Sequence, residues 1–153
     1  MGLKERLHGD LTEAIRSRDE LRSGTIRMVL TAITNEEVSG KSARVLTEGE
    51  IITVLSREAK KRREAADAFT DADRGERAER ETAEGRVITE YLPEQLSEDE
   101  IKKIISEAIT ETGAAGPAGM GIVMKSIQPK VAGKADGGLV SGLVKTALTG
   151  GKQ

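Results

Sequence analysis

The sequence contains no cysteine and a single histidine, His8. The missing thiols exclude disulfides, thiolate zinc sites and a cysteine nucleophile. One imidazole excludes a histidine-rich metal site and disfavours a Ser–His relay. No apolar run approaches the roughly 18 residues of a membrane span, and the segment MGLKERLHGD lacks the apolar core of a signal peptide. These absences predict a cytoplasmic protein without a membrane partner.

Aromatic side chains are nearly absent as well, since Phe69 and Tyr91 are the only two in 153 residues. The core must therefore be built from Leu, Ile, Val, Met and Ala. The same scarcity argues against binding of single-stranded nucleic acid, because unpaired bases are usually bound by stacking on aromatic rings.

Charge is abundant but unevenly distributed along the chain. Charged residues make up 33% of the sequence, and the formal net charge is −2. Residues 113–153 hold five lysines and one acid, Asp136, so this part carries +4 and residues 1–112 carry −6. The C-terminal third is therefore a distinct compositional unit.

Apolar residues recur at helical spacing throughout, and no stretch alternates as a strand would. Capping boxes, in which Ser or Thr is followed three residues later by Glu, begin at Thr47 and Ser97. Pro129 lies late in its segment and predicts a kink or an early helix end. The sequence therefore predicts an all-α chain, with helices near residues 3–15, 23–39, 48–70, 76–92, 98–112, 117–131 and 137–148.

Pro93 marks the expected domain boundary. Proline disfavours helical geometry in the residue before it, so the fourth helix should end at Leu92. We expect an N-terminal helical bundle of about four helices in residues 1–93 and a small three-helix domain in residues 94–153. Three short helices make a core near the lower limit for independent folding.

Four segments together resemble the YqeY-like family, whose sequence is similar to the C-terminal tail of the aminoacyl-tRNA amidotransferase B subunit (GatB). They are TIRMVLTAITNEE (25–37), EIITVLSREAKKRREAADAF (50–69), EYLPEQLSEDE (90–100) and MGIVMKSIQPKVAGKADG (120–137). Each segment is weak alone, but their order and spacing are those of the family.

The resemblance implies a helical bundle joined to a three-helix domain. In the amidotransferase, the similar tail reaches the outer corner of tRNA, away from the chemistry. That enzyme converts misacylated Glu-tRNA or Asp-tRNA to the amide form. By this similarity, family members are classed with carbon–nitrogen ligases that use glutamine as amido-N-donor, which is an analogy of fold and not of a site.

The residues needed for that chemistry are missing from the sequence. There is no cysteine, no glycine- and serine-rich amidase signature and no G-x-x-x-x-G-K-[ST] phosphate loop. The pairs Glu36 with Glu37 and Glu81 with Glu84 are better explained as solvated helix faces than as metal or acid–base sites. We therefore expect no catalytic residue, no metal site and no cofactor.

Two basic clusters are candidates for nucleic-acid binding. The first, Arg57, Lys60 and Lys61, lies in the third predicted helix, where a salt-bridged exposed face is the preferred alternative. The second consists of Lys125, Lys130, Lys134 and Lys145, which have almost no acids nearby in sequence to neutralise them. Lysines that neutralise phosphates give affinity that is independent of sequence and sensitive to salt.

The glycine-rich segment GKADGGLVSGLVKTAL (133–148) has a structural explanation. Asp136 is placed to cap the last helix, with Gly137 in its bare first turn. Gly133 suits the turn out of the preceding helix, and Gly142 would permit close packing against a neighbour. The helix start beside Lys134 could also meet a phosphate, although the Asp136 carboxylate would compete for the same amides.

The leading hypothesis is a non-catalytic helical adaptor that binds tRNA or other folded RNA, or associates with amidotransferase or tRNA-synthesis proteins. One alternative is a protein-interaction module that uses the stripe Met120, Val123, Met124 and Ile127, or the lysine face. The other is a glutamine-dependent amidotransferase in its own right.

Overall fold

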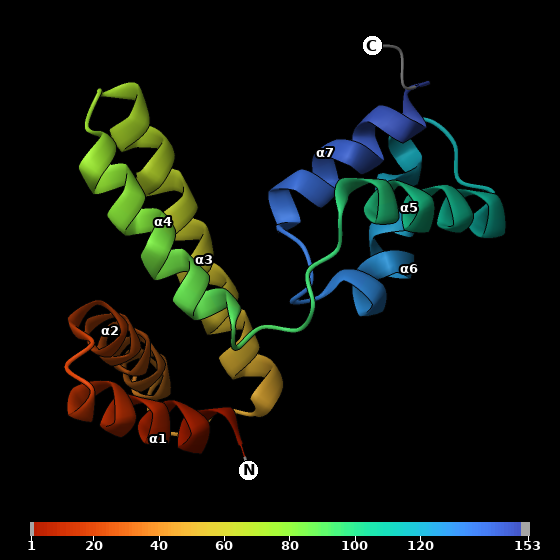
Figure 1. Cartoon of the computed structure of the whole chain (residues 1–153). Coiled ribbons are helices and arrows are strands. Elements are labelled where there is room, and N and C mark those ends of the chain that lie inside the picture. The colour runs from red at the N-terminus through yellow and green to blue at the C-terminus, as the bar shows by residue number, and fades with distance from the viewer. Residues whose placement is uncertain (1, 151–153) are drawn as a thin grey trace. The chain divides into compact units, whose positions relative to one another are not determined.

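The structure, a computed structural model, describes residues 2–150, which contain seven α-helices, one short 3-10 helix and no strand (Figure 1). The prediction of an all-α fold is confirmed. In chain order the elements are α1 (Leu3–Arg16), α2 (Glu20–Glu37), α3 (Glu48–Asp71), α4 (Gly75–Thr89), α5 (Glu98–Thr112), the 3-10 helix η1 (Pro117–Gly119), α6 (Met120–Val131) and α7 (Gly137–Leu148).

The helices form two compact units, Met1–Pro93 and Glu94–Gln153, each with its own aliphatic core. Tyr91 is the single aromatic residue among the buried ones. Burial of apolar surface contributes about 25 cal/mol per Å². Small cores of Ile, Leu and Val therefore stabilise units of this size only if nearly every helix buries its apolar face. No helix within residues 2–150 is both long and apolar enough to cross a membrane.

In the first unit, α3 and α4 form an antiparallel hairpin (Figure 1). The predicted capping box begins α3: the Thr47 hydroxyl accepts from the Glu50 amide at 3.2 Å, and the Glu50 carboxylate accepts from the Thr47 amide at 3.0 Å. This backbone donor lowers the pKa of Glu50. The two helices approach closely at Gly85, where a Cβ would lie 3.4 Å from the Cβ of Arg62.

The second unit packs α5, α6 and α7 around a small core. Its fully buried members are Ile101, Ile105, Ala108, Val123, Ile127, Val140 and Val144. The second predicted capping box, from Ser97 to Glu100, is present, and Gly113 ends α5 with a left-handed φ of 69°. Helix α6 contains Pro129 and continues to Val131, so the expected early end at the proline is wrong.

Three details differ from the predicted elements. Helix α4 ends at Thr89 and not at Leu92, and the amides of Tyr91 and Leu92 donate to the carbonyls three residues back, as in a turn. Helix α2 begins at Glu20 and not near Ser23, because the Asp19 carboxylate accepts from the Arg22 amide at 3.0 Å and caps the helix earlier. In α1, Ile15 is 49% exposed while Ala14 is buried. A spacing of four residues drifts around the helix, so the stripe shifts by one position after three turns.

The glycine-rich segment is only partly as expected. Gly133 directly follows the C-cap residue of α6 and has a φ of 72°, which confirms its predicted role in the turn. Asp136 occupies the N-cap position of α7 with extended backbone, and Gly137 is the first helical residue, but the Asp136 side chain makes no capping hydrogen bond. The predicted close packing at Gly142 is wrong, since this glycine is exposed and no atom lies within 4 Å of a Cβ built there.

These two glycines should respond to alanine in opposite directions. Gly142→Ala should raise the free energy of unfolding by about 0.5–1 kcal/mol, because it removes backbone freedom without a clash. Gly133→Ala should lower it by about 1–2 kcal/mol, because a Cβ is strained at positive φ. Urea denaturation followed by circular dichroism measures both. Destabilisation by Gly142→Ala would contradict the open environment described for this position.

Candidate nucleic-acid interface

The C-terminal lysines lie on α6, on α7 and in the turn that joins them. Lys125 and Lys130 are on α6 and Lys145 is on α7, and all three are exposed. Lys134 is half-buried in the turn. The fifth lysine of this part of the sequence, Lys152, lies outside the described residues.

The turn that carries Lys134 is held by the segment after Pro93. The Leu96 amide donates to the Lys134 carbonyl at 2.8 Å, and the Gln95 side-chain amide donates to the Gly133 carbonyl at 2.9 Å. Leu96 also packs against the core of the second unit. The backbone at Lys134 is therefore fixed by long-range contacts that the local sequence does not specify.

The lysines do not form a single narrow stripe. Lys125 and Lys130 are five residues apart, which is about 140° around a helix. Lys130 and Lys145 lie in the last turns of their helices, where a cation also favours the helix dipole. Lys125 and Lys130 therefore lie on different sides of α6.

Few carboxylates neutralise this surface. Asp136 is the one acid between residues 113 and 153. Within the described residues, Lys125, Lys130 and Lys145 take part in no ion pair, whereas Lys102 on α5 pairs with Glu98 at 3.2 Å. These three lysines are therefore not paired at short range, although α5 of the same unit carries five acids.

The basic cluster on α3 has a different environment. Arg57 lies 3.8 Å from a Glu36 carboxylate oxygen, and Lys61 pairs with Glu58 at 3.1 Å. Lys60 is half-buried. These contacts agree with the alternative of a salt-bridged helix surface.

The paired acids of the sequence also lie in ion pairs. Glu37 binds Lys4 at 3.0 Å, and Glu84 lies 3.6 Å from Arg80. Among the described residues, no group of three acidic or histidine side chains is arranged to hold a metal ion. His8 is exposed on α1.

A buried ionic network that the sequence analysis missed centres on Arg62. Its guanidinium lies 3.5 Å from Glu58 and 3.4 Å from Glu81, and it donates to the Met28 sulfur at 2.8 Å. Glu58 is only 5% exposed. The i,i+4 spacing of Glu58 and Arg62 indicates that they pair. The burial of this pair, however, depends on α2 and α4, which are remote in sequence.

A second network closes the first unit around Tyr91. The buried phenol donates to the Asp10 carboxylate, Arg22 makes two 3.1 Å hydrogen bonds to Glu90, and the Arg6 guanidinium lies 4.6 Å from the ring centroid. Burial, together with the bond to Asp10, raises the pKa of Tyr91 to about 12. The network ties the end of α4 to α1 and α2 just before Pro93.

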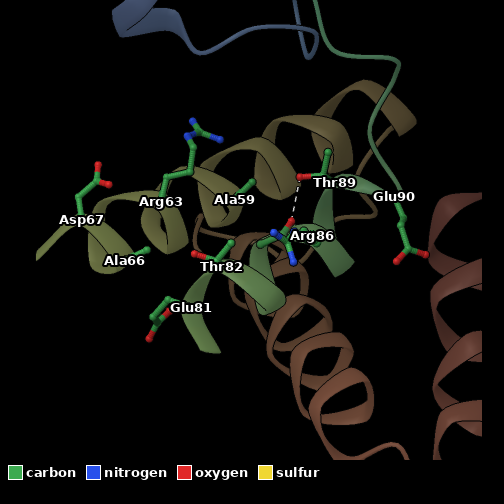
Figure 2. A pocket seen from close by; sticks show the side chains of 10 residues that line it. Ala59, Arg63, Ala66, Asp67, Glu81, Thr82, Arg86, Thr89 and Glu90 are labelled. Carbon is green, nitrogen blue, oxygen red and sulfur yellow. Dashed lines mark hydrogen bonds between the residues drawn. The ribbon is translucent and has the colours of Figure 1, made fainter. Parts of the chain in front are cut away.

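The described chain also has an open pocket on the outer face of the α3–α4 hairpin, with a volume of about 510 Å³ (Figure 2). Small side chains form much of its lining, and Figure 2 shows Arg63 and Arg86 coming from its two opposite helices. The lining contains no cysteine, histidine or serine, and its two hydroxyls, on Thr82 and Thr89, donate to the backbone carbonyls of Ala78 and Gly85.

Comparison with known proteins assigns most of the chain to one family. The profile of the family described as Yqey-like protein matches residues 4–148. "Altered inheritance of mitochondria protein 41, mitochondrial" of Lachancea thermotolerans is 31% identical over 73% of this chain and 60% of its own length. The protein of the same name from Clavispora lusitaniae is 32% identical over 69% of this chain and 61% of its own length. An uncharacterized protein of Schizosaccharomyces pombe is 31% identical over 57% and 69%. The match thus spans about 60% of the first two relatives.

The prediction of a cytoplasmic location is wrong. The two relatives just described, and further ones from Candida glabrata and Pyrenophora tritici-repentis, are named as mitochondrial proteins and point to mitochondria. The prediction rested on the lack of a signal peptide and of a membrane span, and neither absence decides a compartment.

The pKa of Tyr91 can be measured directly, because this is the only tyrosine and the chain has no tryptophan. Its tyrosinate absorbance should appear with a midpoint near pH 12 in the folded chain and near pH 10 after denaturation. The folded chain holds the proton more tightly, so this contribution to stability is complete below about pH 10 and is lost as the pH rises towards about 12.

Asp10→Asn should lower the folded midpoint, since it removes the carboxylate that accepts the phenol proton. Asp99→Asn, in the other unit, is the matched control and should leave it unchanged. A midpoint near 10 while circular dichroism still reports a folded chain would contradict the buried network.

Proposed function

The chain belongs to the YqeY-like family, and from this premise we propose that it is a non-catalytic helical adaptor that binds folded RNA, with tRNA as the first candidate. The observation that carries the proposal is the group of lysines on α6, on α7 and in the turn between them, of which Lys125, Lys130 and Lys145 are exposed and take part in no ion pair within the described residues. Four described lysines lie there with one acid, in a chain that has two aromatic residues. Such a surface suits phosphates displayed by a folded A-form stem.

The tRNA assignment is supported by the resemblance of the sequence to the tail of the amidotransferase B subunit. That tail reaches the outer corner of tRNA. By the same resemblance, we propose amidotransferase or tRNA-synthesis proteins as partners of this chain. The lysine candidates in this role are Lys125, Lys130, Lys134 and Lys145. Arg57, Lys60 and Lys61 remain secondary candidates, because two of them already pair with glutamates.

The apolar stripe suggested for the alternative, a protein-interaction module, is part of the core of the second unit. Val123 and Ile127 are fully buried, and Met120 and Met124 pack against the same core. These four side chains hold the second unit together and are not displayed for a partner. The lysine face also suits an acidic protein. The nuclease treatment described below distinguishes a protein partner from RNA.

Binding of tRNA should be tight at low salt and should weaken steadily as salt rises. Replacing any one of Lys125, Lys130, Lys134 and Lys145 by alanine should lower affinity and reduce the slope of log K against log salt by about one, because one phosphate is then no longer neutralised. Fluorescence anisotropy with labelled tRNA gives both values. Lys103→Ala, on α5 of the same unit, is the matched control.

No tRNA binding at low salt would overturn the proposal. A protein partner that stays bound after nuclease treatment, and is released by the same lysine substitutions, would assign the surface to protein instead.

The isolated chain should release no ammonia from glutamine, with or without ATP and charged tRNA. The reason is chemical: the sequence offers no cysteine nucleophile and no phosphate-binding loop, and the two hydroxyls in the lining of the α3–α4 pocket donate to backbone carbonyls. A coupled ammonia assay on the purified chain tests this. Turnover above that of a heat-denatured sample would show that the chain is an enzyme.

A further inference from the structure

The guanidinium of Arg62 is buried, but its hydrogen bonds are incompletely matched. The Arg62 side chain is 16% exposed, and its contacts with the carboxylates of Glu58 and Glu81 are long, at 3.5 and 3.4 Å. A guanidinium carries five N–H donors. Within the residues that the structure describes, nothing accepts from the buried Nε of Arg62. This cation therefore lacks a strong acceptor along part of its edge.

The shortest of the Arg62 contacts is the one with the weakest acceptor. The Arg62 Nη2 donates to the Met28 sulfur at 2.8 Å, and a thioether accepts hydrogen bonds only weakly. Met28 lies on α2 and is half-buried, so its side chain is partly open to solvent. The thioether thus occupies a position at which a stronger acceptor would bind the guanidinium better.

Oxidation of the thioether to a sulfoxide supplies such an acceptor. A sulfur lone pair attacks one oxygen of hydrogen peroxide, the O–O bond breaks, and the leaving hydroxide takes the proton of the transferred oxygen. The sulfur is oxidised by two electrons, the peroxide is reduced, and the products are methionine sulfoxide and water. Because methionine has three rotatable bonds, the sulfur can withdraw and place the new oxygen beside Arg62.

We propose that Met28 is an oxidation site, at which hydrogen peroxide adds one oxygen and Arg62 binds the resulting sulfoxide. In an apolar core a sulfoxide is destabilising, because it buries a polar group without a partner. Here the partner is a guanidinium, and hydrogen bonds from a charged donor are about twice as strong as neutral ones. The oxygen therefore strengthens the contact of α2 with α3, and the first unit stays folded when Met28 is oxidised.

Tyr91 provides a signal that belongs to the first unit alone. It is the only tyrosine, the chain has no tryptophan, and Phe69, the other aromatic residue, also lies within Met1–Pro93. Tyr91 is buried, so unfolding of this unit exposes its phenol and changes its fluorescence. Urea unfolding followed by tyrosine fluorescence therefore measures the first unit without a contribution from the second.

Treatment of the folded chain with hydrogen peroxide tests the modification. Trypsin releases residues 28–41 as one peptide, in which Met28 is the only methionine. Mass spectrometry should show that this peptide gains one oxygen. The urea midpoint of the treated chain should be equal to that of the untreated chain or higher. A lower midpoint after oxidation, or a peptide that gains oxygen only when the chain is unfolded, would overturn the proposal.

Two substitutions of Met28 test the acceptor without any oxidant. Met28→Gln places a carbonyl oxygen on the side-chain atom that carries the sulfoxide oxygen, whereas Met28→Leu keeps an apolar side chain and removes the acceptor. The ratio of folded to unfolded first unit should be about tenfold higher for Met28→Gln than for Met28→Leu, because the hydrogen bond has a charged donor. Leu30→Gln, on the same helix, is the matched control. Leu30 packs against the apolar core, so this change should lower the ratio.

The order of the two Met28 variants decides the proposal. In an apolar environment leucine is the better replacement for methionine, so a Met28→Leu chain that is as stable as the Met28→Gln chain, or more stable, would overturn the proposal. The proposal does not rest on RNA binding, because the lysines named for RNA on α6, on α7 and in the turn between them lie in the second unit. Failure of either proposal leaves the other intact.

Discussion

The first unit depends on the close antiparallel contact of α3 with α4 at Gly85 and Arg62. A Cβ at Gly85 would lie 3.4 Å from the Cβ of Arg62, and the Arg62 side chain reaches both α4 and α2 from there. There the guanidinium satisfies Glu58 and Glu81 while it contacts the sulfur of Met28 on α2. A buried ion pair contributes little net stability, but loss of one partner leaves an uncompensated charge and is strongly destabilising. This contact therefore fixes how three helices pack.

The two units use charge in different ways. In the first unit, most described carboxylates near the basic cluster of α3 are engaged inside the unit, as with Glu36, Glu37 and Glu81. In the second unit, acids are nearly absent between residues 113 and 153, and the acids of this unit lie mainly on α5. Within the described residues, Lys125, Lys130 and Lys145 take part in no ion pair. The proposed RNA surface thus follows from lysines that are separated along the chain from the acids of their own unit.

Each of the two helical units is held by its own aliphatic core and by polar contacts. In the first unit, the Tyr91 network joins the end of α4 to α1 and α2. In the second unit, Gln95 and Leu96 bind the carbonyls of the turn between α6 and α7. The backbone is therefore fixed on both sides of Pro93, in each case by contacts within one unit.

The sequence by itself determined the helical elements and several of their ends, because the signals are local. Thr47 with Glu50, Ser97 with Glu100, Gly113 and Gly133 act within a few residues of themselves. Tertiary structure decided which side chains those helices bury. The deep position of Glu58, the Tyr91–Asp10 bond and the openness around Gly142 depend on elements remote in sequence, and periodicity within one helix carries no information about what lies opposite.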